Sequence, residues 1–239
     1  MKKFLLFALA AGIIVAIVIA YFLFLDPARS RNRSLMVVQF LRNPESHAAW
    51  KTAAGSQCEG APFQFPIDGY IGYLWDDSFK VGHRHQGIDI FPGGEPGVTA
   101  VYAAYDGYLT RQPDWKSTVI IRIPDDPLNP GSQIWTYYTH MADVDGNSFI
   151  SPQFPPGTSE VFVEAGTFLG YAGNYSGTAG SPTGVHLHFS IVKSNSDGNF
   201  ENELDINNTI DPSLYFGMTL NAGDDPKLPL GCKVDTETP

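Results

Sequence analysis

The sequence predicts an all-β protein, an antiparallel sandwich or barrel, with one apolar helix at its N-terminus. Past residue 63 the chain consists of short β-prone segments, and clusters of proline, glycine and aspartate separate them. The whole chain holds 24 glycines and 18 prolines, which indicates many turns. Many short strands at such spacing are typical of sandwiches and barrels rather than of a βαβ fold.

The N-terminal helix is predicted from residues 4–25, which carry no charge and are almost wholly apolar. A helix of about 22 residues rises roughly 33 Å, enough to cross a hydrocarbon core of about 30 Å. Secretory signals usually have a shorter apolar region and end at small residues, whereas this segment ends in a bulky run. We therefore predict a signal anchor, a transmembrane helix over 1–25; a cleaved signal peptide is the alternative. Basic residues flank both ends, so charge alone sets no orientation.

Residues 26–57 are predicted to be a linker that contains a short helix. Asn43 and Pro44 combine a helix-capping residue with a proline at the first helical position, and Gly55 can end the helix. The helix is therefore expected over about 44–54, with Trp50 as the residue that docks it.

Cys58 and Cys232 are the only cysteines, and they bracket the predicted globular domain. In an oxidising compartment two such cysteines are expected to form one disulfide. Free thiols are the alternative, whereas a cysteine zinc site is disfavoured because the chain has no Cys-x-x-Cys pair. The domain is placed at 58–220 and a C-terminal tail at 221–239.

The strands of that domain are expected where apolar and aromatic residues lie between turn signals. The predicted segments are 69–75, 107–110, 117–123, 134–140, 160–163, 168–172 and 186–192. The net charge of −10 disfavours a nucleic-acid-binding surface, because such domains carry basic patches.

Four of the six histidines fall in three short stretches that also hold an aspartate. These stretches are 85–89, with His85 and Asp89; 139–141, with His140; and 186–189, with His186 and His188. Histidine nitrogen and carboxylate oxygen are the ligands that a catalytic zinc uses, usually three of them with a fourth position open. If the stretches meet in space, the chain can hold such a zinc.

His186 and His188 lie in a β-prone run, so both side chains point to the same face of a strand. One can bind a metal while the other stands beside the metal-bound water. The strand pattern alone does not say which does which. The alternative is that His186 and His188 are ordinary half-buried histidines without a metal. The presence of further candidate ligands in the other two stretches disfavours this alternative.

Taken together, these motifs resemble those of the lysostaphin-like (LytM-type) zinc metallopeptidases, which cut peptidoglycan peptides. The family shows His-x-x-x-Asp, Tyr-x-His and a terminal His-Leu-His-Phe, and this chain has all three, in order, at 85–89, 138–140 and 186–189. Gly-rich and Asp-Pro-Ser-Leu-Tyr segments around them agree as well, so the resemblance covers about 63–216.

The resemblance implies an antiparallel β-fold of the duplicated hybrid motif type, with Zn²⁺ as cofactor. Matched residue by residue, His85, Asp89 and His188 would be the zinc ligands, and His140 and His186 the catalytic histidines. The implied activity is zinc-dependent endopeptidase cleavage of peptidoglycan stem peptides or cross-bridges. One departure is Ser190, where the family often has glutamate; this puts support around the ligands in doubt, but not metal binding itself.

Two surrounding loops and one tyrosine are also expected near the site. Loop 141–160 is predicted to wall the cleft and 174–184 to be a second, mobile wall. Tyr138 precedes His140 by two positions, so it either lines the cleft or packs as a core aromatic.

Two other functions remain open. One is a regulator on the same fold that activates other wall hydrolases, although such members typically lack some of the five site residues. The other is a zinc protease that acts on a different peptide. The signal anchor and the cysteines place the leading candidate at the cell membrane, with a single pass and an extracytoplasmic catalytic domain.

Overall fold

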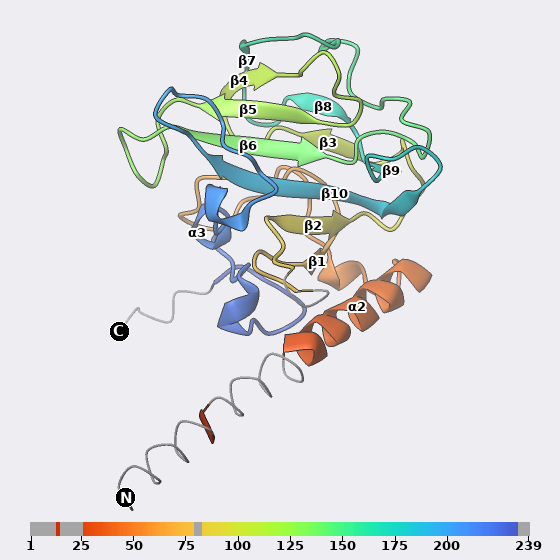
Figure 1. The fold of residues 1–239 in the computed structure, drawn as a ribbon. Coiled ribbons are helices and arrows are strands. Elements are labelled where there is room, and N and C mark those ends of the chain that lie inside the picture. The colour runs from red at the N-terminus through yellow and green to blue at the C-terminus, as the bar shows by residue number, and fades with distance from the viewer. Residues whose placement is uncertain (1–12, 15–25, 79–82, 234–239) are drawn as a thin grey trace, which may run out of the picture.

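The computed structural model describes residues 13–14, 26–78 and 83–233, and of 26–31 only the backbone. One antiparallel sheet dominates it, with strand order β1-β2-β10-β6-β5-β4-β7 (Figure 1). In that order the strands span Tyr70–Tyr73, Ile88–Phe91, Pro182–Lys193, Ile134–Thr139, Val119–Ile123, Gly107–Thr110 and Val161–Val163. The predicted all-β antiparallel fold is confirmed in the described residues.

Four short strands complete the architecture. β9 (Gly173–Tyr175) and β11 (Thr209–Ile210) pair with β10, while β3 (Ala100–Tyr102) and β8 (Phe168–Tyr171) form a separate two-stranded sheet. A one-turn helix, α3 (Ser213–Phe216), follows β11. Strand β10 is the longest and has four partners, so it positions more of the molecule than any other strand described.

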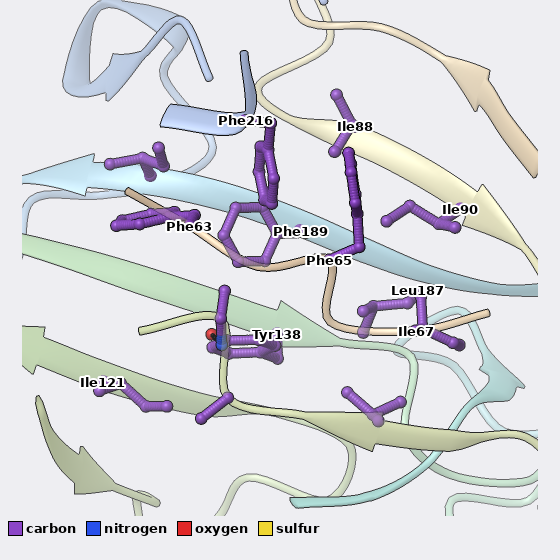
Figure 2. Packing of buried hydrophobic residues seen from close by; sticks show 14 of the residues in the cluster. Phe63, Phe65, Ile67, Ile88, Ile90, Ile121, Tyr138, Leu187, Phe189 and Phe216 are labelled. Atoms are coloured by element: carbon purple, nitrogen blue, oxygen red, sulfur yellow. Dashed lines mark hydrogen bonds between the residues drawn. The ribbon is translucent and has the colours of Figure 1, made fainter. Parts of the chain in front are cut away.

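The hydrophobic core lies against one face of β10. Leu187, Phe189 and Ile191 alternate along this strand and are fully buried. The ring of Phe189 packs edge-on against Tyr138 of β6 at 5.2 Å and against Phe216 of α3 at 5.3 Å, as Figure 2 shows. Because side chains alternate along a strand, His186, His188 and Ser190 point to the opposite face. The core thus fixes which way the histidines point.

The structure corrects the prediction for 26–57. The helix lies over Asp26–Arg42 (α2), and the expected helix at 44–54 is reduced to a 3-10 turn at Ala48–Trp50. Val37 and Phe40, one helical turn apart, are buried against β1 and β2, and Phe40 contacts Tyr70 at a centroid distance of 5.3 Å. Their burial explains why α2 packs on the sheet (Figure 1) instead of forming part of a free linker.

Arg33 joins α2 to the turn after β1. Its guanidinium donates two hydrogen bonds to the carboxylate of Asp77, at 2.5 and 2.6 Å, and both side chains are almost completely buried. The carbonyl of Asp77 accepts the backbone N–H of His85 at 2.8 Å. The helix is therefore connected, through one residue, to the backbone of a candidate metal ligand.

The chain ends of the domain are also tied down. The predicted disulfide between Cys58 and Cys232 is present. Part of the predicted tail, 221–239, follows the domain surface, since Asn221 forms a bridge with Trp75 and Ala222 is buried. Residues 234–239 lie outside the described residues.

The predicted signal anchor over 1–25 lies outside the described residues, apart from Ile13 and Ile14. Within the part of the chain that is described, no helix has both the length and the apolar character needed to cross a membrane.

Candidate active site

The candidate ligands come from two neighbouring strands and the turn before one of them. Strands β2 and β10 pair antiparallel, and their register places Asp89 directly opposite His188. On the other side of β10, His188 lies opposite Thr139, the residue before His140. His85 precedes β2 in the turn held by Asp77. Residues far apart in sequence therefore meet because β10 is central.

Three ligand atoms converge on one point. His85 Nε2 lies 3.1 Å from Asp89 Oδ1, His188 Nδ1 lies 2.9 Å from the same oxygen, and the two nitrogens are 3.0 Å apart. All three residues are buried. Zinc bonds of about 2.0–2.2 Å would separate tetrahedral ligands by roughly 3.3–3.6 Å, so a small expansion of this group fits the ion.

Each candidate histidine ligand has an acceptor behind it. His85 Nδ1 lies 2.9 Å from the Leu74 carbonyl oxygen, which can only accept a hydrogen bond. Nδ1 therefore carries the proton, and Nε2 presents its lone pair to the metal position. His188 is arranged the other way round: its Nε2 lies 2.9 Å from Glu203 Oε1, and Nδ1 faces Asp89. Such outer partners fix ring orientation in metal sites.

The other two histidines stand beside this group with one ring nitrogen left for chemistry. His140 Nδ1 donates to the Tyr175 carbonyl at 2.6 Å, and His186 Nδ1 donates to the Gly184 carbonyl at 2.7 Å. Both rings therefore have an unprotonated Nε2. Their centroids are 4.4 Å apart, and His186 Nε2 lies 3.6 Å from Asp89 Oδ1. All five predicted residues are thus brought together, with His140 and His186 outside the three-atom group.

Burial and nearby groups set the protonation states of the site: Asp89 is ionised, and His140 and His186 are neutral. Burial alone would raise the pKa of Asp89, but His85 and His186 nearby, with hydrogen bonds from His188 and His85, hold it well below its usual range. Asp89 is therefore an ionised ligand. Burial lowers the pKa of His186 and lowers that of His140 to about 3, so both rings are neutral at neutral pH. Burial alone would lower the pKa of His188, but its hydrogen bonds to Asp89 and Glu203 raise it to about 10, so a metal must displace a proton from this ring.

A cleft of about 620 Å³ opens over these residues. Its walls come from the segment before β5, the segment after β9, and a loop after β10. The lining residues are His85, Gln86, Asp89, Asp114, Trp115, Lys116, Ser117, Thr118, Tyr137, Thr139, His140, Tyr175, Ser176, Gly177, Thr183, His186, His188, Glu203 and Leu204. Loop 174–184 forms a wall as predicted, whereas loop 141–160 contributes no lining residue, which corrects that expectation.

Tyr138 is a core residue and does not line the cleft. It is fully buried, and its hydroxyl accepts the Ala104 N–H at 2.9 Å. The prediction that it shares a face with His140 assumed an unbroken strand. β6 ends at Thr139, and His140 has a left-handed backbone, with φ of 69°, so its ring turns to the other face. Tyr137, from that face of β6, lines the cleft instead.

Two parts of the site were not predicted from the sequence. Glu203 belongs to no motif and follows His188 by 15 residues, in a segment rich in asparagine and acidic residues. The cleft wall around Trp115 follows the short strand β4, and its sequence looks like that of an ordinary turn. Neither feature has a sequence motif, so only the folded structure shows that these residues belong to the site.

The low pKa of His140 predicts acid-induced loss of stability. Its pKa is about 3 in the folded protein against an ordinary 6.5, so below pH 6.5 the unfolded chain binds a proton that the folded chain does not. Between pH 6.5 and about 3, this group lowers the free energy of unfolding by up to about 1.4 kcal/mol per pH unit. Urea unfolding of metal-free protein should therefore show a shallower acid slope in His140→Gln than in wild type. Equal slopes would contradict the prediction.

Comparisons with known proteins were made on sequence and on structure. A scan against protein-family models found no match, and a search of the curated proteins found none either. Among solved structures, Csd3 of Helicobacter pylori is similar at 21% identity and a TM-score of 0.39, with 60% of this chain and 34% of that chain covered. Lysostaphin of Staphylococcus simulans follows at 18% identity and 0.39, with 62% and 49% covered.

A putative glycyl-glycine endopeptidase lytM of Ruminococcus gnavus is similar at 22% identity and a TM-score of 0.38, with 64% of this chain and 58% of that chain covered. The chain thus spans about a third of Csd3 and about half of full-length lysostaphin. Two of the solved structures to which this chain is similar, lysostaphin and lytM, bear the names of the peptidase family that its three histidine-bearing motifs resemble.

Proposed function

We propose that this chain is a zinc metalloendopeptidase of the lysostaphin-like family and hydrolyses peptide bonds in peptidoglycan stem peptides or cross-bridges. The observation that carries the proposal is the convergence of His85 Nε2, Asp89 Oδ1 and His188 Nδ1, beside two neutral histidines, at the floor of a cleft. Two nitrogens and one carboxylate oxygen suit zinc, and an open side toward the cleft suits a catalytic rather than a structural site.

The chemistry divides between the metal position and the free histidines. Zinc bound there would lower the pKa of a bound water toward about 7 and polarise the scissile carbonyl. His140 and His186 each have an unprotonated Nε2 at the cleft, so one can take the proton of the attacking water. The other can stabilise charge on the carbonyl oxygen or, once protonated, protonate the leaving amine.

The same proposal includes a location. Residues 4–25 are apolar over a membrane-spanning length, and the Cys58–Cys232 disulfide suits an oxidising compartment. We propose that the chain is a single-pass protein of the cell membrane with its cleft on the extracytoplasmic side. Membrane fractionation with N-terminal sequencing tests this: a soluble main species that starts near Asp26 would overturn it.

Purified protein is expected to contain about one zinc per chain, because the ligand group is complete. Elemental analysis after gentle purification measures this. Asp89→Ala should lose most of the metal, since it removes the only carboxylate among the three ligands. Asp197→Ala, at an exposed aspartate that does not line the cleft, is the matched control and should keep it. Wild-type protein without metal would overturn the proposed enzyme.

The substrate is tested by mass spectrometry of purified muropeptides incubated with full-length protein in detergent, with and without a chelator. We expect new peptide termini only in the absence of chelator and only with an intact Asp89. Cleavage of an unrelated unfolded protein at a similar rate would favour a general zinc protease. Zinc binding without cleavage of either substrate would favour the regulator, an alternative that the presence of all five site residues opposes.

A further inference from the structure

We infer that Glu203 is a positioning residue of the metal site, holding His188 in the tautomer that presents Nδ1 to the metal. The inference rests on the proposed function, since it concerns how the same site is built. None of the motifs contains Glu203, and it lies outside the family's His-Leu-His-Phe segment.

The carboxylate of Glu203 reaches the site from behind. Its Oε1 accepts hydrogen bonds from His188 Nε2 at 2.9 Å and from Ser190 Oγ at 3.1 Å. His188 and Ser190 are two residues apart on β10, so they share a face and converge on one oxygen. The side chain of Glu203 is only 11% exposed. A carboxylate this buried is costly unless partners compensate it, and these two side chains are the partners that the described structure gives it.

The loop that carries Glu203 is anchored at both ends. The Glu201 N–H donates to the Lys193 carbonyl at 2.9 Å, next to the end of β10. Beyond Glu203, the Leu204 carbonyl accepts the side-chain amide of Gln86 at 3.0 Å, beside His85. The loop therefore holds the carboxylate in place by backbone contacts that do not involve the metal position.

The consequence for His188 follows from the hydrogen-bond inventory of an imidazole. A neutral ring has one N–H and one lone pair. Because the Glu203 carboxylate accepts from Nε2–H, the nitrogen from which a metal can displace the proton is Nδ1, which faces Asp89 and His85. Without Glu203 the two tautomers would compete, and the ring could rotate. A carboxylate behind a ligating histidine also makes it a stronger donor to the metal, and removing such partners typically costs 10–100-fold in metal affinity.

The decisive measurement is the zinc dissociation constant, obtained by competition with a chromophoric chelator on full-length protein. Glu203→Ala should raise it about 10–100-fold. Glu203→Gln should raise it less, because the amide oxygen can still accept from Nε2–H although the charge is gone. Glu201→Gln removes the same charge two residues earlier in the same loop and should leave the constant unchanged. The cobalt-substituted protein gives a second readout, since its absorption spectrum should change in Glu203→Ala but not in Glu201→Gln.

Unfolding of the metal-free proteins separates positioning from support of the fold. If Glu203 only held the loop, Glu203→Ala would lower the stability of metal-free protein and leave the zinc constant of the folded fraction unchanged, which would overturn the inference. Should Glu203→Ala fail to fold, Glu203→Gln decides, and wild-type affinity in that variant would also overturn it. Failure of wild type itself to bind zinc would instead overturn the proposed function, so the two failures are distinguishable.

Discussion

Alanine at His140 or at His186 is expected to lower turnover of wall peptides at least ~100-fold while zinc stays bound. General acid–base contributions typically amount to about 10²–10⁴, and each of these rings has one free Nε2 at the cleft. Neither ring belongs to the three-atom ligand group, so the metal should remain. Steady-state kinetics on a defined muropeptide, with zinc content measured on the same sample, tests both halves of the prediction.

His188→Ala is the matched comparison, since it lies two residues from His186 on the same face of β10. It should lose both zinc and activity. Release of zinc by His186→Ala together with retention by His188→Ala would show that the two roles are exchanged. Full activity in all three variants would show that the site lies elsewhere.

Removal of the Cys58–Cys232 disulfide is expected to lower the free energy of unfolding by about 4–5 kcal/mol. The bond closes a loop of 174 residues, and in the chain-entropy model so long a loop restricts the unfolded chain strongly. Urea unfolding of the double variant Cys58→Ser/Cys232→Ser, at fixed zinc concentration, measures the loss. Native disulfides typically contribute 2–5 kcal/mol, so a substantial fall is expected even if other effects offset part of it.

Wild-type protein treated with a reductant is the control for that measurement. It should unfold at the same urea concentration as the double serine variant, because both lack only the cross-link. A double variant as stable as oxidised wild type would contradict the prediction. Two freely alkylated thiols in protein purified without reductant would contradict the pairing itself.

The sequence predicted the fold class and most strands because alternating apolar residues and turn signals are local properties. Each of the seven expected segments overlaps an observed strand. Four strands were missed. β2 (Ile88–Phe91) has only four residues and contains Asp89, whose charge hides the strand pattern. The other three, β3, β9 and β11, have two or three residues each, too few for a period to be visible.

Those residues of the candidate site that belong to sequence motifs could be predicted. The five residues named from the motifs do meet, since β10 brings them together with β2 and β6. What the motifs left open or missed depended on folding. The left-handed turn at His140 separates its face from that of Tyr138, which packs in the core, and Glu203 lies in a loop without a sequence motif. The linker prediction failed because α2 itself contains four arginines, which mask the buried apolar pair Val37 and Phe40.

The packing of α2 sets how far the cleft can lie from the start of that helix. A flexible stalk of 32 residues would let a tethered domain search a wide shell of the wall, whereas α2 begins at Asp26 and is fixed to the sheet by Phe40 and by Arg33 on Asp77. If residues 4–25 cross the membrane as proposed, almost no free tether remains between bilayer and domain. The cleft would then reach only peptidoglycan near the anchor. A fragment that begins at residue 58 would lack Arg33, so Asp77, which bonds the backbone of His85, would be buried without its ion-pair partner.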